Sequence, residues 1–211
     1  GIERIRFMTS HPKDLSDELI ETMAASDKIC RHIHLPLQSG SSRILEAMNR
    51  RYSKEDYLLL VDKIKAAMPD ISITTDIIVG FPGEDDEDLE ETIDVVRKVG
   101  YDSAFTFQYS KRTGTPAASM ENQASKEDVT RRFDKLLKVV QEVAAERTSR
   151  FEGQVMKVLV EEPDTHEEGM LTGRLGNNTV VHFPGDESLI GKIIDVRLDE
   201  CKGFYYIGSR V

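Results

Sequence analysis

The order of apolar and polar positions divides the chain of 211 residues into two parts. From Gly1 to about Arg150, short runs of β-branched and aromatic residues alternate with stretches that repeat apolar residues at helical spacing. This alternation is typical of βαβ units that build a mostly parallel sheet. The predicted strands of this part are Ile2–Thr9, His32–Leu37, Ile71–Val79 and Ser103–Tyr109.

Amphipathic stretches between and after these strands predict helices. Ser16–Ala25 and Lys54–Met68 repeat apolar residues three and four positions apart, and Ser53 with Asp56 has the spacing of a capping box. The stretch Lys126–Arg150 has the same period over a greater length and predicts a long helix that closes the first domain.

After Gly153 the pattern changes to strict alternation of apolar and polar residues, interrupted by turn signals such as Pro-Asp, Gly-Asn-Asn and Pro-Gly-Asp. Short strands at this spacing predict a small closed or nearly closed β-barrel. We therefore predict an α/β domain over residues 1–149 and a β-barrel domain over residues 150–211. The predicted barrel strands are Val155–Val160, Met170–Gly173, Thr179–Phe183, Ile193–Leu198 and Phe204–Ile207.

Composition narrows the class of protein. Apolar residues make up 39% and charged residues 31%, as in ordinary globular proteins. No apolar run approaches the length of about 20 residues that a membrane helix needs, and the first residues lack the basic-then-apolar layout of a signal peptide. We therefore expect a cytoplasmic protein without a membrane partner. The net charge of −10 argues against a generally basic surface, so any contact with RNA must use a local patch.

Cysteines and histidines give little support for a metal site. Cys30 and Cys201 are too few and too distant for a disulfide framework or a zinc ribbon. His32 and His34 point to one side of a predicted strand, but no third ligand converges with them, which favours packed or hydrogen-bonded histidines.

Small and polar motifs follow the predicted strands, where ligands bind in open α/β sheets and in (β/α) barrels. Gln38–Ser41 offers short donors and acceptors beside a glycine, and Gly80 with Phe81 would let a flat ring approach the backbone. Ordinary turns and helix caps explain the same residue types. The motifs are Thr9–Pro12, Gln38–Ser41, Gly80–Glu84 and Tyr109–Pro116.

Each cluster of charged residues can be interpreted as a binding site or as an ordinary structural feature. The acidic run Glu84–Asp88 favours the start of a helix over a metal site. Basic residues after the second and fourth strands are candidates for binding anions, but surface solvation explains each of them better. Along the long helix, a phosphate-binding stripe and a solvated face with ion pairs explain the basic residues equally well. These residues are Arg43, Arg50, Arg51, Lys111, Arg112, Arg131, Arg132, Lys135 and Lys138.

Four segments, taken in order, resemble one family. IRFMTSHPKD (Ile5–Asp14), HIHLPLQSGSSRIL (His32–Leu45), TTDIIVGFPGE (Thr74–Glu84) and FQYSKRTGTPAA (Phe107–Ala118) are similar to the strand-end motifs of radical S-adenosylmethionine (SAM) methylthiotransferases. The tail from about Arg150 resembles the TRAM domain of these enzymes. The resemblance implies the later portion of a radical SAM partial (β/α) barrel, followed by an OB-like TRAM barrel.

Within the family, the chain is most similar to the MiaB branch, which adds a methylthio group to N6-isopentenyladenosine next to the anticodon. The branches that modify a ribosomal-protein aspartate or threonylcarbamoyladenosine in tRNA remain alternatives, as does a non-catalytic RNA-binding module. The resemblance implies SAM, two 4Fe-4S clusters, a sulfur donor and the anticodon stem-loop of tRNA as cofactors and partners. Since the cluster motif Cys-x3-Cys-x2-Cys is missing from the sequence, we expect a later part of such an enzyme that is inactive alone.

The resemblance also implies site residues. The residues expected near SAM are Gln38, Ser39, Ile78, Gly80, Tyr109 and Ser110. Residues in a local basic patch would contact RNA, although the tail is acidic overall. The residues expected at RNA are Arg112, Lys157, Arg174 and Lys202.

Overall fold

A computed structural model describes residues 1–8 and 11–211 of the chain. The chain forms two compact units. The α/β unit contains Phe7–Ser26 and Ile33–Val143, and the barrel unit contains Gly1–Arg6, Asp27–His32 and Ala144–Val211. The first predicted site motif, Thr9–Pro12, lies partly outside the described residues.

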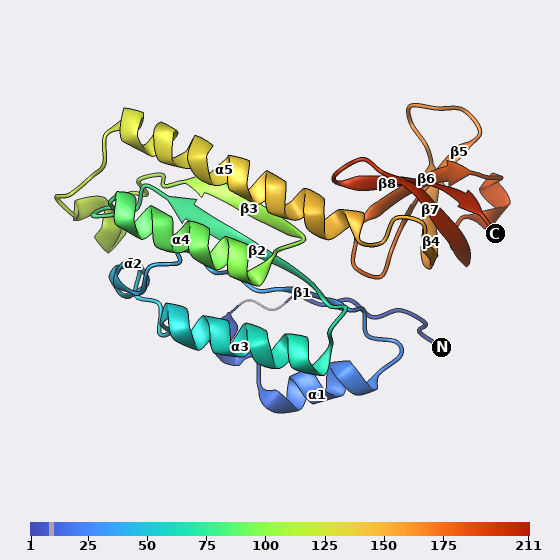
Figure 1. The fold of residues 1–211 in the computed structure, drawn as a ribbon, viewed down its shortest axis with the longest axis horizontal. Helices are drawn as coiled ribbons and strands as arrows, with labels where there is room; N and C mark the ends of the chain where they lie inside the picture. Colours follow the sequence, from blue (N-terminus) through green and yellow to red (C-terminus); the bar gives the residue numbers. More distant parts are fainter. Residues whose placement is uncertain (9–10) are drawn as a thin grey trace. The chain divides into compact units, whose positions relative to one another are not determined.

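The α/β unit is built on a three-stranded sheet with the order β1-β2-β3 (Figure 1). Strand β1 spans His32–His34, β2 spans Ser72–Val79, and β3 spans Ser103–Gln108. Strands β2 and β3 pair in parallel from Thr74 opposite Ser103 to Val79 opposite Gln108. The parallel strands predicted at these three places are confirmed. The helices are α1 (Asp17–Ala25), α2 (Ser42–Ala47), α3 (Lys54–Ala67), α4 (Asp86–Val99) and α5 (Lys126–Ser149), with 3-10 turns at Pro12–Asp14 and Pro116–Ser119.

The two faces of β2 differ in burial. Ile73, Thr75, Ile77 and Val79 are buried to 1% exposure or less, while the alternate residues from Thr74 to Ile78 are partly exposed. The buried face belongs to the core that also holds apolar side chains of α3 and α4. The other face is therefore available for a site.

Helix starts follow local sequence signals. Ser53 and Asp56 form the predicted capping box of α3. Asp85 and Asp88 form another at the start of α4, so the acidic run opens a helix as expected. The helix α4 ends at Gly100, which adopts a left-handed conformation with φ of 64°.

The barrel unit holds a closed barrel with the strand order β4-β5-β6-β8-β7. Every strand predicted after Gly153 is present within a few residues of its expected bounds. The strands are β4 (Val155–Pro163), β5 (Met170–Arg174), β6 (Val180–Pro184), β7 (Ile193–Cys201) and β8 (Tyr205–Arg210), with a 3-10 turn at Glu187–Leu189. Alternate residues fill the interior, which is centred on Phe183 and Tyr206.

The strand predicted at Ile2–Thr9 is wrong over its described part. Only a single parallel bridge joins Ile5 to Ile29. Apolar residues stand at Ile2, Ile5, Phe7 and Met8, without the alternation of a half-buried strand, and Ile2 and Met8 are 67% and 69% exposed.

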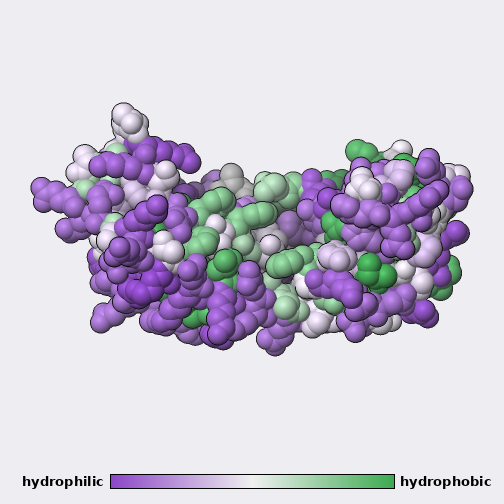
Figure 2. Space-filling model, turned by 90° about the horizontal axis from the view of Figure 1, so that it is seen from above, coloured by the Kyte–Doolittle hydropathy of each residue, from purple (hydrophilic) through white to green (hydrophobic). Residues whose placement is uncertain are grey.

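Polar side chains cover much of the face shown in Figure 2, with apolar side chains in patches between them. Among the described residues, no helix combines the length and apolar character needed to cross a membrane.

Candidate functional site

A pocket of about 620 Å³ lies at the carboxyl end of the sheet in the α/β unit. Its walls come from the segments that follow β1, β2 and β3, together with the partly exposed face of β2 and β3. Four of the predicted SAM residues and one predicted RNA residue line it. The lining residues are Gln38, Met48, Arg50, Asp76, Ile78, Phe81, Phe107, Gln108, Tyr109, Ser110, Arg112, Thr115 and Ala117.

Gln38 has a backbone conformation that is rare for residues other than glycine, with φ of 67°. Two hydrogen bonds hold it to β2, from its N–H to the Asp76 carbonyl at 2.8 Å and from the Ile78 N–H to its carbonyl at 2.9 Å. Such strain costs about 1–3 kcal/mol and tends to occur at functional sites. In this conformation Gln38 lies in the wall of the pocket.

Hydrogen bonds from the core hold the segment that precedes Gln38. Tyr57 and Thr75 both donate to the Leu35 carbonyl at 2.8 Å, and Thr75 accepts from the Leu37 N–H at 2.8 Å. Tyr52 donates to the Leu37 carbonyl at 3.1 Å, and burial raises the pKa of Tyr52 to about 12. The segment is therefore rigid before any ligand binds.

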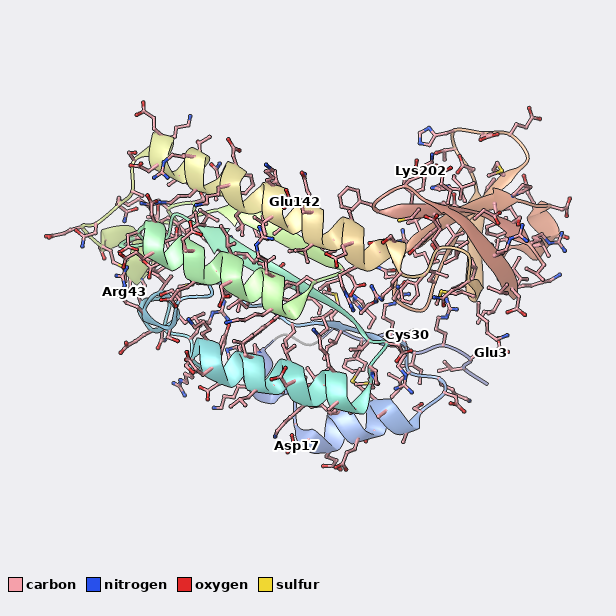
Figure 3. All side chains as sticks on the ribbon, viewed as in Figure 1. Glu3, Asp17, Cys30, Arg43, Glu142 and Lys202 are labelled. Carbon is pink, nitrogen blue, oxygen red and sulfur yellow. The ribbon has the colours of Figure 1, made fainter. Side chains whose placement is uncertain are left out.

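Helix α4 holds the segment that follows Gln38. The Gly40 N–H donates to Thr92 at 2.9 Å, and the Ser41 hydroxyl donates to Asp88 at 2.7 Å. Arg43, labelled in Figure 3, forms ion pairs with Asp85 and Asp88. Ser39 is completely buried and does not line the pocket.

A tight turn follows β2. Gly80 has φ of 82°, and its N–H donates to the buried carboxylate of Glu84. Burial raises the pKa of Glu84 to about 7, against the lowering effects of the Gly80 N–H and Arg132. Gly80 does not line the pocket. The side chain of Val129 occupies the space that a Cβ at position 80 would need. Glycine is thus required here by the backbone and by packing.

Tyr109 brings a hydroxyl to the pocket wall. Its ring packs edge-on against Phe81 with 5.4 Å between the ring centroids. The hydroxyl is buried and has no hydrogen-bond partner among the described residues. A buried donor without a partner is costly, and a ligand in the pocket would satisfy it.

The structure adds one acidic side chain that the sequence reasoning missed. Asp76 lines the pocket, and its carboxylate lies 3.3 Å from Nε2 of His34, whose Nδ1 lies 3.0 Å from the Thr74 hydroxyl. A carboxylate within the apolar strand Ile71–Val79 was the available signal, because it shares a face with Ile78. His34 is thus a hydrogen-bonded histidine, as predicted.

Basic residues fall into two groups. Arg50 and Arg112 line the pocket. The predicted barrel residues each pair with a carboxylate in their own unit: Lys157 with Asp195 at 3.5 Å, Arg174 with Glu161 at 2.9 Å, and Lys202 (Figure 3) with Glu200 at 2.5 Å.

The basic face of α5 is also occupied by ion pairs. Arg131 and Arg132 pair with Asp86 at 3.0 and 2.7 Å, and Lys135 pairs with Glu90. Of the two interpretations of this helix, an anion-binding face or a solvated face with ion pairs, these three residues fit the second.

The donor set suits SAM but not an iron–sulfur cluster. The pocket combines apolar walls with amide, hydroxyl, carboxylate and guanidinium groups, as a nucleoside with a charged amino-acid tail requires. Among the described residues, no group of three or more histidine, cysteine or acidic side chains is placed to hold a metal ion. Cys30 and Cys201 are both free thiols, so the cluster ligands of the family are not present in this chain.

Comparisons with known proteins place the chain among named relatives. The chain is 61% identical over 209 residues to a protein of Lachnoclostridium phytofermentans named tRNA-2-methylthio-N(6)-dimethylallyladenosine synthase, covering 99% of this chain and 46% of that protein. It is 55% identical to the protein of the same name from Alkaliphilus oremlandii, covering 99% of this chain and 44% of that protein. The chain thus spans about half the length of these curated relatives.

A solved structure shares the fold. Coproporphyrinogen III oxidase (HemN) from Escherichia coli, described as a radical SAM enzyme, matches with a TM-score of 0.56 and 13% identity, over 82% of this chain and 44% of that one. The family model of the Radical SAM superfamily matches residues 1–96, and the model of the TRAM domain matches residues 149–211. The chain therefore carries a Radical SAM domain match over residues 1–96 and a TRAM domain over residues 149–211.

Proposed function

We propose that the chain is the later part of a radical SAM tRNA methylthiotransferase, which adds a methylthio group to N6-isopentenyladenosine next to the anticodon. The observation that carries the proposal is the identity of 61% over 99% of the chain to a relative with that named product. The alignment with this relative covers both the α/β unit and the barrel unit. The tRNA substrate favours a cytoplasmic protein.

The pocket at the carboxyl end of the sheet would bind SAM, which supplies radical chemistry for reaction at an unactivated C–H bond. Gln38 and Ser110 would bind polar parts of the cofactor, and Ile78 would pack against its adenine. The Tyr109 hydroxyl would form a hydrogen bond that it lacks among the described residues. Ser39 and Gly80 would act through backbone placement, since both are buried outside the pocket lining.

The open face of the sheet would receive the target nucleoside. Phe105 and Phe107 are 55% and 51% exposed, although such large apolar rings favour burial. Exposed rings of this kind stack on nucleobases. Arg112, at the pocket, and Lys157, Arg174 and Lys202, on the barrel, would contact RNA phosphates.

The cluster chemistry and the sulfur donor belong to parts of the enzyme that this chain does not supply, because the cluster ligands are not among its residues. We therefore propose two 4Fe-4S clusters for the full-length protein and no methylthiolation by this chain alone.

The direct test is modification of tRNA by the full-length protein, purified and reconstituted without oxygen. We expect 2-methylthio-N6-isopentenyladenosine in nucleoside digests of tRNA that carries N6-isopentenyladenosine. Mass spectrometry of the same digests would detect methylthiolated threonylcarbamoyladenosine, and ribosomal-protein digests would detect a modified aspartate. Either of those products, without the isopentenyladenosine product, would replace the proposal with the corresponding alternative. No product on any substrate, with RNA binding retained, would favour the non-catalytic module.

A further inference from the structure

Two arginines of the N-terminal segment are hydrogen-bonded to the barrel. Arg4 donates to the carbonyls of Arg174 and Lys157 at 2.9 and 3.1 Å. Arg6 donates to the carbonyl of Leu175 at 3.2 Å and to the side chain of Asn178. Gly1–Arg6 belongs to the barrel unit, and these contacts join residues about 170 positions apart within it.

The acceptors of these two arginines are neutral. Lys157, Arg174, Arg197 and Lys202 of the barrel instead pair with carboxylates, as Arg174 does with Glu161 and Arg197 with Asp199. Neither Arg4 nor Arg6 forms an ion pair among the described residues. Backbone carbonyls orient a guanidinium group but leave its unit charge in place.

The two side chains are also accessible in part. Arg6 is exposed and Arg4 is half-buried, and burial is the main reason why the pKa of Arg4 is lowered. Arg6 further lowers the pKa of Arg4 by repulsion, and Cys30 and Glu161 oppose these effects. Two like charges are therefore held close together at the end of β5 and on the turn that follows it, in a chain with a net charge of −10.

We propose that Arg4 and Arg6, held on the turn 174–178, bind the phosphate backbone of the RNA substrate. This inference rests on the proposed function and adds a second source of cations to the barrel surface. A guanidinium has more N–H donors than these carbonyl bonds use, so free donors and the positive charge remain for a phosphate. The polar turn residues Asn177 and Asn178 add short hydrogen-bonding side chains beside the same charges. Phosphate fits because it is the anion that RNA presents at every nucleotide.

A purely structural role predicts a different outcome. Hydrogen bonds from arginine to backbone carbonyls depend on the positions of its N–H donors, whereas phosphate binding depends on its positive charge. Arg6→Lys keeps the charge and loses the planar fork, and Arg6→Gln loses the charge. The pair of variants therefore separates the two roles at the more exposed position.

The test is tRNA affinity of the full-length protein, measured by fluorescence anisotropy at several salt concentrations. For Arg6→Gln we expect a Kd about tenfold higher and a salt dependence of log K reduced by about one. Arg6→Lys should recover most of the affinity. The control is Arg197→Gln in the same unit, whose charge is already paired with Asp199, and it should change Kd by less than about twofold. Thermal unfolding of each variant excludes loss of folding as the cause.

Equal Kd and equal salt dependence for Arg6→Gln and Arg197→Gln would overturn the inference, as would a loss in Arg6→Lys as large as that in Arg6→Gln. The proposed function would survive that result if the wild type still modified tRNA. Absence of tRNA binding or modification by the wild type would instead reject the proposed function itself.

Discussion

Gly40→Ala should destabilise the α/β unit strongly, because helix α4 passes directly over this glycine. A Cβ at position 40 would lie 2.4 Å from the Thr92 Cα, 2.7 Å from the Glu91 carbonyl oxygen and 2.8 Å from the Thr92 nitrogen. All three are backbone atoms of α4, so rotation of a side chain cannot relieve the overlap. Normal contact distances of about 3.5 Å require a shift of about 1 Å.

Several terms set the magnitude of this effect. Overpacking of a core costs about 1–3 kcal/mol, and α4 is anchored by buried side chains that include Leu89 and Val96. The shift would also weaken the bond from the Gly40 N–H to Thr92, which contributes about 1 kcal/mol. The lower chain entropy of alanine in the unfolded state offsets about 0.4–1 kcal/mol. We expect a net loss of about 3 kcal/mol in the free energy of unfolding.

Urea unfolding followed by circular dichroism measures this loss, and hydrogen exchange of α4 peptides locates it. Gly83→Ala is the matched control in the same unit, since no atom lies within 4 Å of its added Cβ. Gly83 has φ of 86°, so its substitution should cost only the left-handed strain of about 1–2 kcal/mol. A loss below 1 kcal/mol for Gly40→Ala, or unchanged exchange in α4, would refute the packing argument.

Two further predictions concern Glu84, in the turn after β2, and Tyr109, in the pocket wall. Because burial raises the pKa of Glu84 from 4.5 to about 7, the folded state binds more protons than the unfolded state between these values, and stability falls as pH rises through this window. Glu84→Gln should remove that pH dependence, which amounts to at most about 3 kcal/mol in the free energy of unfolding. Urea midpoints at pH 5 and pH 8 check this, and a variant that keeps the wild-type difference between them would contradict it. Tyr109→Phe should raise the Kd of the reconstituted full-length protein for SAM about tenfold without loss of stability, because its hydroxyl has no partner among the described residues. Calorimetric titration checks that value, and a stability loss with unchanged SAM affinity would assign the hydroxyl a structural role.

Local sequence patterns were sufficient for the elements themselves. The alternation after Gly153 specifies the barrel strands because side chains on a strand point to opposite faces, so the apolar set defines the interior. The capping pair Ser53 and Asp56 marks the start of α3 because its bonds join residues only three positions apart. Parallel strands that end in polar motifs also located the pocket, which Gln38 and Tyr109 line as the motifs suggested.

Long-range contacts decided the rest. The pairing of β2 with β3 brings Asp76 to the same pocket as Phe107 and Tyr109, and Gly40 is required only because α4 crosses it. The segment Ile2–Met8 forms no regular strand, and its Arg4 and Arg6 bind carbonyls about 170 residues away. Periodicity describes which face of an element is apolar, but it carries no information on which distant backbone that face meets. Local patterns in the sequence thus determined the strands other than Ile2–Thr9, the main helices and the end of the sheet that forms the pocket, because these depend on residues close in the chain. The tertiary structure decided which charges are paired, because the partners lie far apart in the sequence.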